Sequence, residues 1–344
     1  MASFPDPKYF GRFWGEADIG RAAPRFVQVA IDPTATSDTQ VSAKTHQGVC
    51  ACIGLDTTTP YCEPAGRRVF IIDSTRENEM TAKGKVLVLV SSGHGLPLKD
   101  GKVYTGAGYY LNELTVPVRA LMQEGYEITF SNPKGNTPQL DVHSAVPDFF
   151  GGDAAKLADY MKFRDSLTEL KNPTPLPKVV ASGLDQYDAV FVPGGHGPME
   201  DLLDDPDAGT IMRHFHQTSK PTAVLCHGPI SLLSALPNSV EFVKALSAGD
   251  AAGAAQKAKG WIYAGYKMTI FSTAEEQQRE PMEIGGKVLF YPDFALRTAG
   301  GDVSVAAPWA SYVLQDRELI SGQNPFSDQA LLKLLLPVLD AKKK

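Results

Sequence analysis

Short β-branched runs that alternate with helix-favouring stretches constrain the fold of this chain more than any other feature. The first run begins after Lys83, is bounded by glycine and lacks polar alternation, as in a strand buried on both faces of a sheet. Taken in order, the runs are GKVLVLVSS, YEITFSN, DAVFVPGG, TAVLCHG and KMTIFST. This alternation predicts an α/β fold with a parallel sheet sandwiched by helices.

Helix and edge signals surround these strands. Apolar residues spaced by three and four predict a helix that Gly125 closes as a C-terminal cap, and they are Leu111, Leu114, Val118, Leu121 and Met122. Near the C-terminus, DRELISG predicts a hairpin or an edge strand. The final apolar stretch, SDQALLKLLLPVLD, predicts a closing helix that Pro337 kinks or ends.

Two regions depart from the alternating pattern. Residues 1–80 are rich in Pro, Gly, Thr and charge without a sustained period, and we expect them to form an extension packed on the main domain, residues 81–344. Residues 141–183 exceed the length of a simple crossover and contain a charged, helix-favouring stretch followed by NPTPLPK. This second region is predicted to be an inserted lid or cap.

Composition excludes several classes of protein. The 33 basic and 39 acidic residues give a net charge of -6, and the only basic run is the terminal lysine triplet, so we expect no nucleic-acid partner. No stretch approaches the roughly 20 apolar residues of a membrane span. The N-terminal residues also lack the pattern of a secretory signal, so a cytoplasmic location is expected.

Three of the four cysteines lie close together in VCACIGLDTTTPYC, at positions 50, 52 and 62. Their spacing offers three thiols with only His46 nearby, whereas a zinc site requires paired CxxC elements or a CxxC with distant histidines. We therefore expect free, partly buried thiols, which fits a reducing compartment.

The fourth cysteine, Cys226, follows an apolar strand and precedes a helix predicted from Pro229. Glycine in the turn and proline in the first helical turn are what a sharp strand-to-helix elbow requires. Such an elbow exposes a nucleophile beside backbone N–H groups, and the helix N-terminus favours a thiolate. Taken alone, the pattern equally fits a buried core cysteine.

Two further motifs are weak alone. VFVPGGHGPMEDL places Gly194, Gly195 and His196 at the end of a neighbouring strand, where open α/β sheets bind ligands, although a plain tight turn would look the same. Glu113 lies at the start of the helix before Pro117, where a solvated surface glutamate is the ordinary expectation. Their combination with Cys226 carries more information than each motif alone.

Together these residues resemble the ThiJ/PfpI superfamily, from about Lys83 to the C-terminus. The resemblance implies a flavodoxin-like, class I glutamine amidotransferase-like fold. It rests on GKVLVLVSS, YYLNELTVP, VFVPGGHG, AVLCHGP and DRELISGQNPFS. Within the superfamily, SSGHGLPLKDGKVYTGAGYYLNE and the long insertion before the GGHG turn are similar to the heat-inducible chaperone and glyoxalase III branch.

The resemblance implies a mechanism without cofactors. Cys226 would attack an α-oxoaldehyde such as methylglyoxal, with Glu113 hydrogen-bonded to the thiol and His227 as the base. The family orients this histidine with an acidic residue, for which we expect Glu276, with Glu275 as the close alternative and an exposed acidic turn as the ordinary reading. The groups expected to bind the oxyanion or substrate are Gly194, Gly195, His196 and Gly228. No metal is expected, because Arg119 stands about where the first zinc-binding histidine of some members would lie.

Other functions remain open at this point. The chain could be a holding chaperone for unfolded proteins, with Cys226 as a redox sensor. For the enzyme, the resemblance also implies deglycation of early methylglyoxal adducts on proteins as a side reaction. The same elbow would also serve an isonitrile hydratase or an amidase. Relatives are commonly homodimers, and a two-fold dimer is the commonest state among homo-oligomers, so we expect a homodimer.

Overall fold

The computed structural model describes residues 43–45, 48–50 and 82–341. Strands β1 (Ala43–Thr45) and β2 (Gly48–Cys50) pair antiparallel. Residues 82–341 belong to one compact unit. The predicted packing of residues 1–80 on the main domain lies outside the described residues, as do the thiols of Cys50, Cys52 and Cys62.

Seven strands form the central sheet in the order β12-β13-β9-β8-β3-β6-β7. All neighbouring pairs are parallel except the β12–β13 hairpin. The strands are β3 Gly84–Leu89, β6 Tyr126–Asn132, β7 Thr174–Pro175, β8 Ala189–Val192, β9 Thr222–Leu225, β12 Val313–Asp316 and β13 Leu319–Gly322. The predicted α/β fold and the edge hairpin at DRELISG are confirmed.

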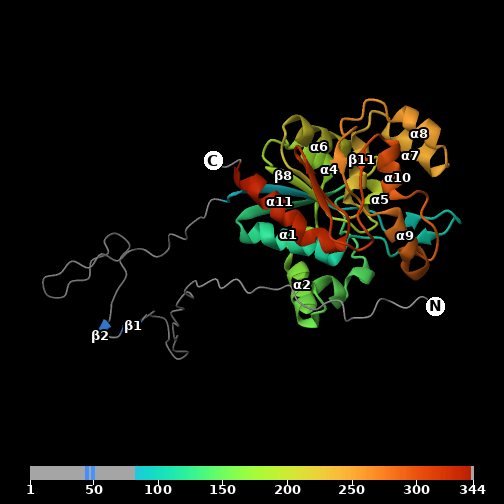
Figure 1. The fold of residues 1–344 in the computed structure, drawn as a ribbon. Helices are drawn as coiled ribbons and strands as arrows, with labels where there is room; N and C mark the ends of the chain where they lie inside the picture. Colours follow the sequence, from blue (N-terminus) through green and yellow to red (C-terminus); the bar gives the residue numbers. More distant parts are fainter. Residues whose placement is uncertain (1–42, 46–47, 51–81, 342–344) are drawn as a thin grey trace. The chain divides into compact units, whose positions relative to one another are not determined.

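Helices cover both faces of this sheet because its strands are apolar on both sides. Val86 and Val88 pack with α1 (Leu111–Gln123) and α11 (Asp328–Ala341), which lie side by side in Figure 1. Leu87 and Leu89 belong to the opposite cluster, with α4 (Leu176–Ala181) and α6 (Pro206–Gln217). Successive side chains of β3 thus point to opposite faces of the sheet and contribute to the two halves of the core.

The fifth predicted strand, KMTIFST, is not part of this sheet. Only β10 (Lys267–Met268) is extended, and it pairs with β11 (Asp302–Val303) in a separate two-stranded sheet. The position beside β9 is taken by β13. The rest of the run crosses the ends of these strands, where the backbone N–H of Phe271 donates to the carbonyl of Cys226 at 3.0 Å.

The two predicted helices around the sheet are present. Gly125 follows α1 with a φ of +89°, as expected for a glycine that ends a helix. Pro337 does not end α11, which continues to Ala341.

Residues 141–183 are mostly helical. They comprise η2 Val142–Ser144, η3 Pro147–Phe150, α2 Ala154–Ser166, α3 Thr168–Lys171, β7 and α4. Helix α2 packs on α1 through Arg119, whose guanidinium lies 4.2 Å from the ring of Tyr160 and 4.4 Å from that of Phe163. The segment therefore also supplies an edge strand, and its action as a lid stays a prediction.

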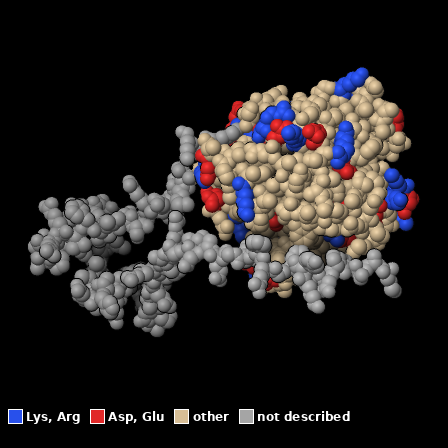
Figure 2. Space-filling view, viewed as in Figure 1, with Lys and Arg blue, Asp and Glu red and all other residues tan. Residues whose placement is uncertain are grey.

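The remaining elements lie around the carboxyl ends of the strands or on the outer surface. They are β4 Leu96–Pro97, β5 Val103–Tyr104, α5 Pro198–Asp201, η4 Gly228–Ala235, α7 Ser239–Ser247, α8 Ala251–Lys257, α9 Thr273–Arg279, η5 Glu280–Ile284, α10 Pro292–Thr298 and η6 Pro325–Ser327. Among the described residues, no helix is long and apolar enough to span a membrane. On the face drawn in Figure 2, charged side chains of both signs are interspersed.

Candidate active site

The elbow after β9 holds Cys226 in a backbone conformation that is rare for a residue with a side chain. Its φ is +57°, and strain of this kind persists only where the surroundings enforce it. The N–H of Cys226 donates to the carbonyl of Gly322 at 2.8 Å, and its carbonyl accepts from Phe271. A Cβ on Gly228 would lie 2.4 Å from the carbonyl oxygen of Val192, so glycine lets the turn pack against β8.

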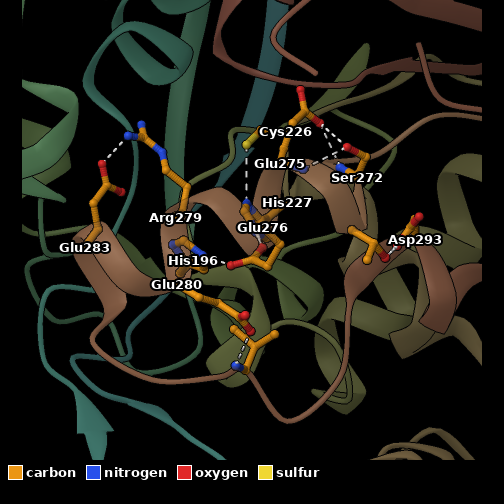
Figure 3. A network of polar contacts seen from close by, with 12 residues as sticks. His196, Cys226, His227, Ser272, Glu275, Glu276, Arg279, Glu280, Glu283 and Asp293 are labelled. Atoms are coloured by element: carbon orange, nitrogen blue, oxygen red, sulfur yellow. Dashed lines mark hydrogen bonds and ion pairs between the residues drawn. The ribbon is translucent and has the colours of Figure 1, made fainter. Parts of the chain in front are cut away.

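A cysteine, a histidine and a glutamate are linked in sequence at this elbow (Figure 3). The Sγ of Cys226 lies 3.3 Å from Nδ1 of His227, and Nε2 of His227 lies 2.7 Å from Oε2 of Glu276. A carboxylate only accepts hydrogen bonds, so Nε2 carries a proton and Nδ1 of the neutral ring accepts from the thiol. All three side chains are almost fully buried. This is the order of groups that activates a nucleophile through a base and an orienting acid.

The structure separates the two candidate glutamates of α9. Glu276 faces His227, whereas the carboxylate of Glu275 turns toward other groups (Figure 3). Glu275 forms a capping box with Ser272 at the start of α9. It also accepts from the backbone N–H of Trp309 and from the side-chain amides of Gln323 and Asn324. Glu275 thus ties the helix to the loop before β12 and to the segment after β13.

His196 meets the same carboxylate as His227. Its Nε2 donates to Oε1 of Glu276 at 2.7 Å, and the two imidazole ring centroids are 4.3 Å apart. The other ring nitrogen, Nδ1, is buried with no hydrogen-bond partner among the described residues. Glu276 therefore bridges two histidines from the ends of adjacent strands.

The two glycines before His196 allow close packing at the site. A Cβ on Gly194 would lie 2.2 Å from Oε2 of Glu113 and 2.4 Å from Cβ of Cys226. Gly195 has a φ of +84°, and its Cβ would lie 2.1 Å from the carbonyl oxygen of Gly108. Neither position can hold a larger residue without displacing the groups around it.

Glu113 lies in the first turn of α1 and is completely buried beside Gly194 and Cys226. Neither carboxyl oxygen has a well-aligned hydrogen bond among the described residues. Burial raises the pKa of Glu113 to about 8, although the nearby thiol and the backbone N–H of Gly194 oppose this rise. Glu113 is therefore mainly protonated at neutral pH and carries a proton it can give.

Burial and charge set the other protonation states. Burial, and then the adjacent Glu113, raise the pKa of the Cys226 thiol well above its usual value. Burial and the neighbouring His196 lower the pKa of His227. Burial alone would raise the pKa of Glu276, but His196 and His227 outweigh it and hold that pKa below the usual range. The resting site thus contains a thiol, a neutral His227 and an ionised Glu276.

His196, His227 and Glu276 are the described side chains whose donor atoms lie close enough together to share a metal ion. Both histidines already donate to Glu276 at 2.7 Å. In this structure, the three groups form a hydrogen-bonded network.

The predicted residues Glu113, Gly194, Gly195, His196, Cys226, His227, Gly228 and Glu276 all lie around this elbow. Sequence reasoning missed Tyr104, whose ring meets that of His196 edge-on at 5.8 Å between centroids. It also missed Arg279, which pairs with Glu283 and donates to the hydroxyl of Tyr110 at 2.8 Å. The opposite charges of Arg279 and Glu283, four residues apart in a helical stretch, were a readable signal for that pair.

A family model described as ThiJ/PfpI family-like matches residues 105–257, which include Glu113, the GGHG turn and the elbow. The described fold and the curated relatives below agree with this match. Over this stretch, the chain resembles the ThiJ/PfpI superfamily.

Among curated proteins, the chain is similar to HchA deglycases. It is 28% identical over 257 residues to the protein/nucleic acid deglycase HchA of Escherichia coli. The match covers 73% of this chain and 80% of that protein.

Two solved structures share this fold. The Rapid Encystment Protein 24 KDa of Francisella tularensis is 24% identical, with a TM-score of 0.55, and the match covers 74% of this chain and 99% of that one. Glyoxalase III from Candida albicans is 23% identical, also with a TM-score of 0.55, over 74% of this chain and 97% of that one.

Proposed function

We propose that this protein is a glyoxalase III-like enzyme that converts methylglyoxal or a related α-oxoaldehyde to a 2-hydroxy acid without a cofactor. The observation that carries the proposal is the contact of Cys226 with the His227–Glu276 pair, beside a buried and protonated Glu113. One group can take the proton of the thiol and another can donate one, as addition of a thiol to a carbonyl requires.

The first step is addition of the Cys226 sulfur to the aldehyde carbon. Nδ1 of His227 takes the thiol proton, a C–S bond forms, and the aldehyde oxygen gains a proton to give a hemithioacetal. Glu113 or His227 supplies that proton. Glu276 orients the His227 ring and stabilises its protonated form through the 2.7 Å hydrogen bond.

The second step is an internal redox isomerisation that needs no external oxidant. A base removes the proton from the former aldehyde carbon, the adjacent ketone oxygen is protonated to give an enediol, and a proton then returns to the adjacent carbon. The product is a 2-hydroxyacyl thioester. Water hydrolyses it to the 2-hydroxy acid and restores the thiol, so the net reaction adds one water to the α-oxoaldehyde. Glu113 and His227 are the proton carriers in this sequence.

The residues around Gly194 complete the proposed site. We assign Gly194, Gly195 and Gly228 to the backbone that surrounds the oxyanion, with His196 in the adjoining wall. Close approach of a ligand to this backbone fits the lack of a side chain at Gly194, where a Cβ would strike Glu113 and Cys226.

Removal of early methylglyoxal adducts from proteins is a second activity of this proposal, because the E. coli relatives are named protein/nucleic acid deglycases. In such a reaction, the hemiaminal carbon of a glycated side chain would exchange its C–N bond for a C–S bond to Cys226, and the amine would leave with the proton of the thiol. The resulting hemithioacetal would then follow the steps above. The proposed partners are thus a small aldehyde or a glycated protein, in a cytoplasmic homodimer.

The deciding test is lactate formation from methylglyoxal without glutathione, after treatment with a chelator. The native chain is compared with Cys226→Ala. Turnover that disappears in the variant supports the enzyme and its nucleophile together. If neither protein forms lactate, the glyoxalase assignment fails, and suppression of aggregation by Cys226→Ser or turnover of isonitriles and amides would identify one of the other functions.

A further inference from the structure

Glu276 is the only described carboxylate that hydrogen-bonds both histidines of the site. Oε1 accepts from His196 and Oε2 accepts from His227, each at 2.7 Å. The two rings are nearly in contact, and all three side chains are at most 2% exposed. Figure 3 shows His196 and His227 on the same side of α9, converging on Glu276.

The environment of His196 is otherwise enclosed. The groups in contact with it are Tyr104 of β5, His227 after β9 and Glu276 of α9, and the charges of Asp141 before η2 and Glu283 of η5 also act on it. Glu283 is already paired with Arg279, and Asp141 is in contact with His143 and Tyr104, so Glu276 is the acid left to balance a charge on either imidazole. A proton that enters this group is therefore shared between the two imidazoles.

We propose that His196 is a positioning residue that holds Glu276 in place and takes the first proton bound by the histidine pair, so that His227 stays neutral and able to accept the Cys226 proton. For its effect on turnover, this inference rests on the proposed function. Its effect on the thiol does not.

One ionised carboxylate balances one imidazolium, whereas two imidazolium rings in contact would leave a buried positive charge. Either ring could take the single proton, but the surrounding charges differ. The carboxylates of Glu276, Asp141 and Glu283 raise the pKa of His196 despite its burial, while burial and His196 lower the pKa of His227. His196 thus takes the proton first.

The test is His196→Gln, because the glutamine amide can still donate to Glu276 but cannot be protonated. With no competing imidazolium, the pKa of His227 rises, and the acidic limb of kcat/KM moves to higher pH by on the order of one unit. His216→Gln is the matched control. His216 also contacts a glutamate, since its Nδ1 lies 2.9 Å from Glu318 Oε1, but it lies outside the site. The acidic limb of kcat/KM should therefore not move in His216→Gln.

A second readout requires no aldehyde. The rate at which iodoacetamide alkylates Cys226 is followed against pH by mass spectrometry of the Cys226 peptide. The same upward shift is expected in His196→Gln. A shift in alkylation without any lactate formation by the native chain would uphold this inference and remove the proposed function. If lactate formation depends on Cys226 but neither pH profile shifts in His196→Gln, the proposed function stands and this inference is wrong.

A third measurement uses the native chain and does not depend on a folded variant. In a ¹⁵N-histidine NMR titration, with resonances assigned through single substitutions that remain folded or through the ring contacts, His196 is expected to be protonated at higher pH than His227. If His227 takes the first proton, the inference is wrong.

Discussion

Replacing Glu113 by glutamine should make the stability of this protein less sensitive to rising pH. Burial raises the pKa of Glu113 to about 8, against 4.5 for an ordinary glutamate. A carboxyl group whose pKa is higher in the folded state favours folding below its unfolded pKa, and that contribution is lost as the pH rises toward the folded pKa. Glutamine has nearly the same shape and does not titrate, so its contribution is constant over this range.

The size of the effect follows from the two pKa values. Each unit of difference corresponds to about 1.4 kcal/mol, so native Glu113 lowers the free energy of unfolding by less than about 1 kcal/mol at pH 5 and by about 4 kcal/mol at pH 8. The free energy of unfolding of Glu113→Gln, relative to native, should therefore increase by roughly 3 to 4 kcal/mol between pH 5 and pH 8. Any constant effect of the amide cancels in this comparison.

Urea unfolding of both proteins at several pH values, followed by tryptophan fluorescence, measures this difference. The same preparations should show reduced lactate formation in Glu113→Gln, because the amide cannot act as a proton donor of similar acidity. If the two free energies of unfolding change in parallel with pH, Glu113 is already ionised in the folded protein. Its assignment as a proton donor would then be incorrect.

Three other substitutions probe neighbouring parts of the site. Glu276→Gln should lower kcat by on the order of 10²- to 10⁴-fold, since His227 loses its orienting anion, with steady-state kinetics as the assay. Glu275→Gln is the matched control. It should instead lower the free energy of unfolding by about 1 to 3 kcal/mol, because Glu275 accepts hydrogen bonds from several buried groups. Equal losses of kcat in both variants would refute this division of roles. Gly194→Ala should abolish most turnover and cost about 1 to 3 kcal/mol of stability, because its Cβ would strike Glu113 and Cys226, and a fully active variant would contradict the packing described.

The main sheet was readable from the sequence because its strands are buried on both faces, which demands nearly continuous apolar runs such as the one after Lys83. The run that begins at Lys267 looked the same and was misassigned. Apolar character there reflects burial against the ends of β9 and β13, since Ile270 and Phe271 are buried without lying in a strand. An apolar run in the sequence indicates that its residues are buried, but it does not show whether they also pair in a sheet.

The choice between Glu275 and Glu276 was open in the sequence, although a local signal for it existed. Ser272 and Glu275 have the spacing of a capping box, and the structure shows that this box forms. That arrangement commits Glu275 to the start of α9 and leaves Glu276 on the face toward His227. The link from Glu276 to His196 had no such signal, because the two residues are 80 positions apart and meet only through the order of the strands.

Two buried carboxyl groups in one site have opposite protonation states, and the cause is the neighbours of each. Glu276 faces two histidines that stabilise its anion, while Glu113 faces a thiol and the backbone of Gly194, which compensate little for its burial. Separation of this kind assigns one carboxyl group to orient a base and leaves the other as an acid. The strained Cys226 lies between the protonated Glu113 and the neutral His227, so a proton donor and a proton acceptor flank its sulfur. A proton that passes from the thiol to His227 stays within the site, so the net charge of the site does not change. In the mechanism that we propose, the thiol proton is therefore removed by a general base during attack, and a standing thiolate is not required.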